Sequence, residues 1–144
     1  RIVSATSTAG TYAGLLAGMD LLGAGTAVTG FDTYEGAARS RAAARTLLDA
    51  LGPMLDREPV PEGTVDILDG YCGDGYGIPT AEATEAIELF ARTEGILLDP
   101  VYSGKAAAGL IDVVRRSLIG DDERVLFLHT GGAPGLFAYS GEFA

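Results

Sequence analysis

The chain has 144 residues, enough for one compact domain with a buried core. Hydrophobic residues make up 47% and charged residues 21%, the balance of a globular protein rather than a disordered one. The formal net charge is −10 at pH 7, which argues against a nucleic-acid partner because a phosphate backbone would repel such a surface. No apolar run approaches the roughly 20 residues that span a bilayer, so we expect no membrane partner.

Cys72 is the only cysteine, which excludes an intrachain disulfide and a metal site built on several cysteines. We therefore expect a reducing, cytoplasmic location. Three scattered carboxylates, Asp69, Asp74 and Asp99, show no recognisable spacing of metal ligands, and no metal site is predicted. The chain opens on a strand-like run without a methionine, so we expect further residues upstream.

In the first half of the chain, short apolar runs alternate with helical patterns. Residues 2–5 are predicted to form a buried strand, and residues 11–22, which are apolar on most faces, a buried helix. A second strand is expected over residues 26–31. The Ala- and Arg-rich residues 34–51 contain strong helix formers and predict a second helix.

The second half continues the alternation. Residues 56–63, with two prolines, are expected to be a loop, and residues 65–68 a third strand. After the glycine-rich residues 69–79, Thr80 is expected to cap a helix. A further helix after residue 104 should bury one stripe, and residues 125–129 should form the last strand; the stripe comprises Ala107, Leu110, Ile111, Val114 and Leu118.

This alternation predicts the α/β class, with right-handed βαβ units and a mostly parallel sheet flanked by helices, in a single domain over residues 1–144. Ligands of such sheets gather at the carboxyl ends of the strands. Two loops rich in small residues are expected there, residues 6–10 after the first strand and residues 130–132 after the last one.

The first of these loops has the features of an anion site. A strand ends, small residues follow and a helix begins, which leaves unpaired N–H groups and the positive end of a helix dipole. Hydroxyl groups of residues 6–11 add donors. The pattern lacks the endings of a P-loop and of a dinucleotide-binding turn, and ordinary Ser/Thr/Gly turns look the same.

Four segments together resemble one family, the pyridoxal 5'-phosphate (PLP) dependent D-cysteine desulfhydrases and ACC deaminases. They occur in the family order and span nearly the whole chain: Thr6-Ser7-Thr8-Ala9-Gly10-Thr11, Gly75-Tyr76-Gly77-Ile78-Pro79, Asp99-Pro100-Val101-Tyr102-Ser103-Gly104-Lys105, and His129-Thr130-Gly131-Gly132-Ala133-Pro134. The resemblance implies a fold-type-II PLP enzyme with three αβα layers, of which this chain is the C-terminal part.

The resemblance also implies roles for single residues. Tyr76 and Tyr102 match the family's active-site tyrosines, and Ser103 and Thr130 match positions beside the cofactor ring. The residues that would hold the cofactor phosphate are Ser7, Thr8, Ala9, Gly10 and Thr11.

Ser103 and Thr130 also bear on the reaction. ACC deaminases are expected to have a glutamate and an apolar residue at these places, and a glutamate would strengthen the cofactor as an electron sink. A neutral hydroxyl suits β-elimination, in which an α-proton leaves with a good thiolate leaving group. The sequence therefore favours a lyase that converts D-cysteine to pyruvate, ammonia and sulfide, with ACC deaminase or L-cysteate sulfo-lyase as alternatives.

PLP enzymes need a lysine that binds the cofactor covalently. The single lysine, Lys105, matches the family's Gly-Lys helix start, where its role is structural or electrostatic. The Schiff-base lysine is thus expected in a missing N-terminal half or a complementary chain, and this chain alone should be inactive. A non-catalytic phosphate-binding module or accessory subunit is the alternative of another class. The resemblance further implies a small amino-acid substrate and a homodimer.

Overall fold

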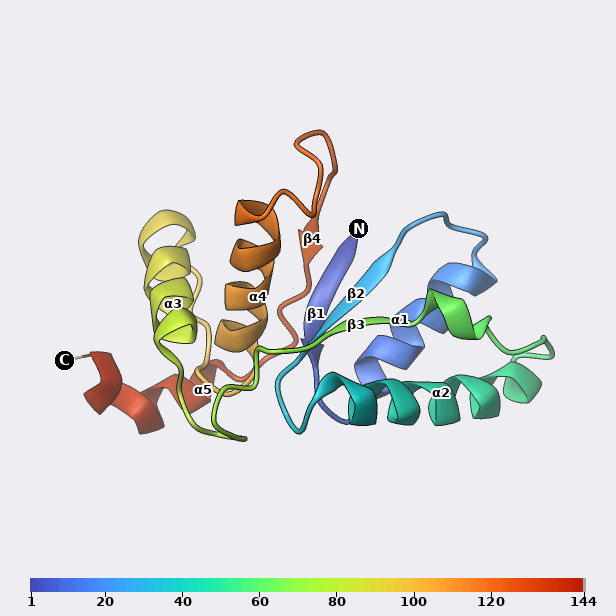
Figure 1. Cartoon of the computed structure of the whole chain (residues 1–144), viewed down its shortest axis with the longest axis horizontal. Coiled ribbons are helices and arrows are strands. Elements are labelled where there is room, and N and C mark those ends of the chain that lie inside the picture. Colours follow the sequence, from blue (N-terminus) through green and yellow to red (C-terminus); the bar gives the residue numbers. More distant parts are fainter. Residues whose placement is uncertain (144) are drawn as a thin grey trace.

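A computed structural model describes residues 1–143, whose arrangement is shown in Figure 1. In this part, parallel strands form one sheet in the order β3-β2-β1-β4. The strands are β1 (Ile2–Thr6), β2 (Val28–Asp32), β3 (Asp66–Leu68) and β4 (Leu126–Phe127). The helices are α1 (Gly10–Leu21), α2 (Ala37–Met54), α3 (Ala81–Glu94), α4 (Ser103–Arg115) and α5 (Ala133–Leu136), with 3-10 helices η1 (Glu62–Thr64) and η2 (Phe137–Phe143).

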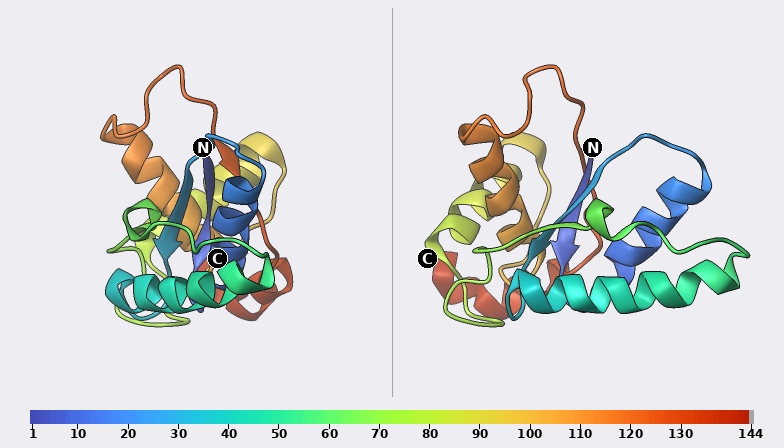
Figure 2. Two further views of the ribbon diagram at one scale, coloured as in Figure 1. Left: turned by 90° about the vertical axis from the view of Figure 1, so that its right-hand side faces the viewer. Right: turned by 45° about the vertical axis from the view of Figure 1, so that its right-hand side comes forward.

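Helices cover both faces of the sheet, which confirms the predicted α/β class (Figures 1 and 2). Side chains of a strand alternate between the two faces, so Val28 and Phe31 of β2 point in opposite directions. Val28 packs with α1 and α2, and Phe31 packs with Ala106 and Val113 of α4. The outer helix α3 packs on α4. The sheet thus carries a separate apolar core on each side.

The predicted strands are confirmed with ends shifted by up to two residues, and β4 is shortened the most. Residues 125–129 were expected to be extended in full, but the ladder includes only Leu126 and Phe127. These two residues pair with Ile2 and Val3 of β1, after which the chain leaves the sheet. The early departure frees residues 130–132 to form a loop at the carboxyl end of the sheet.

Helix α2 begins later than the sequence suggested. Its start was expected at residue 34, but the amide groups of Tyr34 and Gly36 both donate to Asp32 Oδ2, at 3.3 and 2.8 Å. A carboxylate that accepts nearby N–H groups stabilises a turn in competition with a helix. The helix therefore begins at Ala37, and it ends at Met54 rather than at residue 51.

The buried stripe predicted for α4 is wrong at its C-terminal end. Helix α4 ends at Arg115, and Ser117 has a left-handed φ of 54°. Leu118 consequently lies beyond the helix and is 57% exposed, while Val114 is 52% exposed. The helix is instead packed tightly near its start, where Ala106, Ala107 and Ala108 are all buried. The short helices α5 and η2 had not been predicted.

Two findings concern features that residues 1–143 lack. Among them, no helix combines the length and the apolar character that crossing a membrane requires. Within the same residues, no three potential histidine, cysteine or carboxylate ligands are grouped closely enough to hold a metal ion.

Candidate functional site

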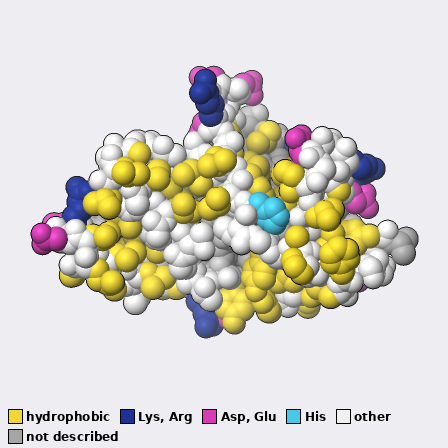
Figure 3. Space-filling view, turned by 180° about the vertical axis from the view of Figure 1, so that it is seen from behind, with side chains coloured by type: hydrophobic (Ala, Val, Ile, Leu, Met, Phe, Trp, Pro, Cys, Tyr) yellow, Lys and Arg dark blue, Asp and Glu magenta, His cyan; other side chains and the backbone are white. Residues whose placement is uncertain are grey.

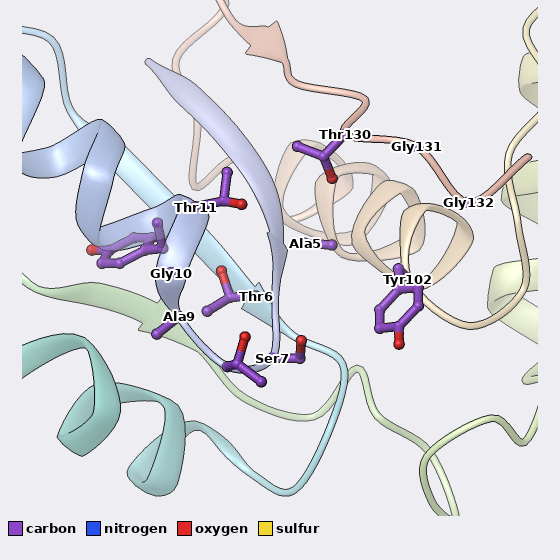
Figure 4. A pocket seen from close by; sticks show the side chains of 12 residues that line it. Ala5, Thr6, Ser7, Ala9, Gly10, Thr11, Tyr102, Thr130, Gly131 and Gly132 are labelled. Carbon is purple, nitrogen blue, oxygen red and sulfur yellow. The ribbon is translucent and has the colours of Figure 1, made fainter. Parts of the chain in front are cut away.

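A cavity of about 270 Å³ lies at the carboxyl end of β1, next to the loop that follows β4 (Figure 4). The turn between β1 and α1 forms one wall, and Tyr102 with the loop after β4 forms the other. The lining residues are Ala5, Thr6, Ser7, Thr8, Ala9, Gly10, Thr11, Tyr12, Tyr102, Thr130, Gly131 and Gly132. The cavity thus brings together all the residues predicted to bind the cofactor or to act in catalysis, except Tyr76 and Ser103.

The β1–α1 turn, residues 6–11, points the start of a helix at the cavity (Figure 4). The first backbone bond of α1 runs from Ala13 N to Ala9 O at 2.9 Å, so the amides of Gly10, Thr11 and Tyr12 precede the helical ladder. Ala9 stands at the N-cap with a left-handed φ of 63° and has no side-chain acceptor for them. These amides, at the positive end of the helix dipole, can bind an anion.

Thr6 supplies an independent sign that the turn is built for a ligand. Its Oγ1 is buried and has no hydrogen-bond partner among residues 1–143, although the residue lines the cavity. A buried hydroxyl without a partner is uncommon in proteins. Gly30 on β2 makes room for it, because a Cβ at Gly30 would lie only 2.4 Å from Thr6 Oγ1.

Two residues of the neighbouring β2–α2 region support the turn from behind. Ser40 Oγ lies 3.2 Å from the carbonyl oxygen of Ser7 and also contacts the carboxylate of Asp32. Ser40 and Asp32 are both buried. Because Asp32 also holds the start of α2, the turn is fixed relative to that helix.

Asp99 organises the opposite wall. Its buried carboxylate accepts hydrogen bonds from the backbone amides of Val101, Tyr102 and Ser103 at 2.8, 2.9 and 2.9 Å. The Ser103 hydroxyl donates to the same carboxylate at 2.6 Å and accepts from Asp99 N at 2.8 Å. Asp99 therefore caps the start of α4 and fixes the backbone of Tyr102, while the hydroxyl of Ser103 is engaged behind the cavity wall.

The loop after β4 lies against the same carboxylate. A Cβ at Gly132 would be 2.4 Å from Asp99 Oδ1, and Gly132 has a φ of +92°, so this position requires glycine. Thr130 lines the cavity. His129 does not line it, and its Nε2 lies 3.1 Å from the carbonyl oxygen of Leu97.

The two predicted active-site tyrosines form a pair at the rim. The hydroxyls of Tyr76 and Tyr102 are in contact, although Tyr76 is 51% exposed and lies outside the cavity lining. The hydrogen bond with Tyr76, together with burial, raises the pKa of Tyr102 to about 12. Tyr34 adds a third ring, edge-on to Tyr76 with centroids 5.2 Å apart. At neutral pH, Tyr102 is thus a protonated phenol.

Comparison with known proteins assigns this arrangement to a family. The model of the family "Pyridoxal-phosphate dependent enzyme" matches residues 1–131. A crystal structure described as an ACC deaminase homologue superposes with a TM-score of 0.89 at 33% sequence identity. The alignment covers 98% of this chain and 42% of that chain.

The chain belongs to the pyridoxal-phosphate dependent enzyme family. It spans less than half the length of the ACC deaminase homologue to which it is similar. The resemblance inferred from the four sequence segments is therefore confirmed at the level of the family and of the fold.

The β1–α1 turn fits the phosphate of the cofactor that gives this family its name. It offers backbone amides that precede the helical ladder, the hydroxyls of Ser7, Thr8 and Thr11, and the partnerless Thr6 Oγ1. A Cβ at Gly10 would meet no atom within 4 Å, so a ligand can approach the backbone closely there. The assignment of Ser7, Thr8, Ala9, Gly10 and Thr11 to the phosphate stays a prediction, as do the roles of the other site residues.

Sequence reasoning missed the residues that support the two walls. Asp99 precedes a proline and a helix start, a pattern typical of capping carboxylates, and this signal could have identified it. Asp32 and Ser40 are separated by a turn and the first residues of a helix, and no local pattern connects them. Their link to the carbonyl of Ser7 depends on how two layers of the fold meet.

Proposed function

We propose that this chain is the C-terminal part of a PLP-dependent lyase that eliminates the thiol group of D-cysteine, giving pyruvate, ammonia and sulfide. The observation that carries the proposal is the cavity itself, in which an anion-binding turn faces a protonated tyrosine and the Thr130 loop. When bound, PLP supplies the electron sink for loss of the α-proton and the β-substituent. The residues of this chain hold, orient and enclose the reacting groups.

Tyr102 is suited to donate a proton or a hydrogen bond inside the cavity. With a pKa raised to about 12, its phenol stays protonated at neutral pH and is a poor base. A phenol on this wall can orient the substrate carboxylate or stabilise the departing thiolate. We propose that the base that removes the α-proton lies outside residues 1–143.

Ser103 supports elimination over opening of the ACC ring. By the family resemblance, it stands where an ACC deaminase is expected to have a glutamate, which would stabilise a protonated cofactor ring more strongly than a neutral side chain. The buried carboxylate behind it, Asp99, already accepts from three backbone amides and from the Ser103 hydroxyl. A weaker electron sink suffices when the leaving group is a thiolate.

We infer that a lysine that binds the cofactor would lie outside this chain. Lys105 is fully buried, does not line the cavity and donates to two backbone carbonyls. We propose that the remaining part of the polypeptide, or a complementary chain, contributes that lysine, and that the assembled enzyme is a homodimer. A non-catalytic accessory subunit is the second candidate, favoured by the same position of Lys105.

The test is a substrate comparison on the full-length protein. We expect sulfide and pyruvate from D-cysteine at a rate well above that from L-cysteine, and slower opening of ACC. Faster turnover of ACC would replace the proposal with the activity for which the similar structure is named. Borohydride reduction in the presence of PLP tests the second candidate. A non-catalytic subunit would show no cofactor attached covalently to a lysine after reduction.

A further inference from the structure

We propose that Lys105 is a positioning residue that holds the tyrosine loop, residues 69–79, against the start of α4 and so keeps Tyr76 in contact with Tyr102. The inference deepens the proposed function, because it concerns how the rim of the same cavity is assembled. Lys105 touches neither the cavity nor its ligand-binding turn. It acts through the loop that carries Tyr76.

The tyrosine loop has no regular secondary structure to hold its shape. Between β3 and α3 the chain makes only bends and turns, and Gly70, Gly73 and Gly77 have positive φ angles. A segment of this kind depends on contacts from other elements. Any group that fixes its backbone therefore also determines where Tyr76 lies.

Lys105 provides such a contact from inside α4. Its Nζ donates to the carbonyl oxygens of Cys72 and Gly75, at 2.5 and 3.0 Å. Gly75 directly precedes Tyr76, and Lys105 lies three residues after Tyr102 on the first turn of α4. One ammonium group thus connects the two segments that carry the paired phenols.

The burial of this ammonium group indicates that Lys105 is needed for its hydrogen bonds and not only to fill space. The side chain is 0% exposed, and burial lowers the pKa of Lys105, an effect that Cys72 and Asp99 partly oppose. Burying a charged group is unfavourable unless its donors are satisfied. An apolar side chain would fill the same space without that cost, but it could not bind the two carbonyls.

The other end of the loop and the loop's outer side have separate anchors. Tyr139 donates from its hydroxyl to Gly77 O at 2.8 Å, and the Cys72 thiol donates to Tyr34 O at 2.8 Å. Neither reaches α4. Loss of Lys105 should therefore release the loop from the Tyr102 wall while leaving it tethered elsewhere.

The experiment compares the full-length protein with its Lys105→Met and Lys105→Gln variants by hydrogen–deuterium exchange. Methionine removes every donor and keeps an unbranched stem, and glutamine keeps a shorter donor. Arg115→Met is the matched control, a cation on the same helix that pairs with Glu85 at the surface. Exchange needs no catalytic activity, so its result is independent of the proposed lyase reaction, which the sulfide assay tests in the wild-type protein.

We expect amides of residues 69–79 to exchange roughly tenfold faster in Lys105→Met, with a smaller increase in Lys105→Gln and none in Arg115→Met, while α1 is unchanged. In an active enzyme, kcat/KM should fall by on the order of 10- to 100-fold, as expected when a catalytic wall is misplaced. Unchanged exchange in the loop would overturn the proposal. Misfolding of both Lys105 variants would also overturn it, because Lys105 would then be a core residue rather than a positioning one.

Discussion

The cavity wall after β1 comes from consecutive residues, whereas the opposite wall joins segments that lie far apart in the sequence. Residues 6–11 offer mainly backbone amides and short hydroxyls, directed by the start of α1 (Figure 4). The Tyr102 wall depends on the Asp99 carboxylate, the Lys105 ammonium and the loop after β4. A cofactor group that stays the same for every substrate can be held by a fixed local turn, while a wall of long-range contacts can change with the substrate.

The surface view adds a second contrast between regions. In Figure 3, hydrophobic side chains spread over much of the face seen from behind, with charged side chains at its margins. Leu97 and Phe137 are among the exposed apolar residues of the molecule, and His129 binds the carbonyl of Leu97. In a chain with a net charge of −10, a face with few charges fits our proposal that further polypeptide completes the enzyme.

The largest stability effect should come from Asp99. Asp99→Ala leaves three backbone amides and the Ser103 hydroxyl without their acceptor, and we expect a loss of about 3 kcal/mol or more in the free energy of unfolding. Urea denaturation of the full-length protein measures it.

Ser103→Ala is the matched control for that variant. It removes one hydroxyl from the same cluster and should cost about 1 kcal/mol. Equal losses for the two variants would mean that Asp99 does not organise the wall, and the contrast between the two walls would disappear.

The next largest changes in stability are expected at two glycines, one on each side of the sheet. A Cβ at Gly109 of α4 would lie 2.3 Å from the ring of Phe31, so Gly109→Ala should destabilise the protein by about 1–3 kcal/mol. A Cβ at Gly14 of α1 would meet nothing within 4 Å, so Gly14→Ala should stabilise it by up to about 1 kcal/mol. Thermal unfolding of both variants measures the difference, and the same sign for both would contradict the packing described here.

The smallest expected effect is a change in the pKa of Tyr102. Because the hydrogen bond between Tyr76 and Tyr102 favours the protonated form of Tyr102, Tyr76→Phe should lower the pKa of Tyr102 from about 12 toward the ordinary tyrosine value of 10.0. The 13Cζ signal of labelled tyrosine, assigned with Tyr102→Phe, follows it directly. A Tyr102 pKa that stays near 12 in Tyr76→Phe would show that the two phenols are not paired in solution.

The same shift has a consequence for stability at high pH. The folded form of Tyr102 keeps its proton above the pKa of an unfolded tyrosine, so its contribution to stability is complete below pH 10 and is lost as the pH rises toward 12. Burial raises the pKa of Tyr12 to about 12 as well, so both walls should weaken in this range. Urea midpoints measured between pH 9 and 12 check the direction.

The two walls also differ in how far the sequence predicts them. The β1–α1 turn was predicted because a strand, small residues and a helix follow each other directly, and the Thr80 cap of α3 was predicted for the same local reason and is confirmed by its bond from Ala83 N. The late start of α2 and the buried bonds of Lys105 were not predictable. They depend on carbonyl and carboxylate partners that only the folded chain brings near.

The stripe on α4 illustrates the same limit. Val114 continues the apolar period but faces outward, because the helix is buried through its small residues near the N-terminus. Apolar periodicity predicts which face of a helix is buried. Tight contacts, such as that of Gly109 with Phe31, determine which part of that face is covered.

A crystal structure of the full-length protein grown with PLP tests the central claim most directly. We predict that the phosphate lies within hydrogen-bonding distance of the amides of Gly10 and Thr11, with the cofactor ring between that turn and Tyr102. A phosphate bound elsewhere, or a cofactor ring on the far side of α1, would contradict the account.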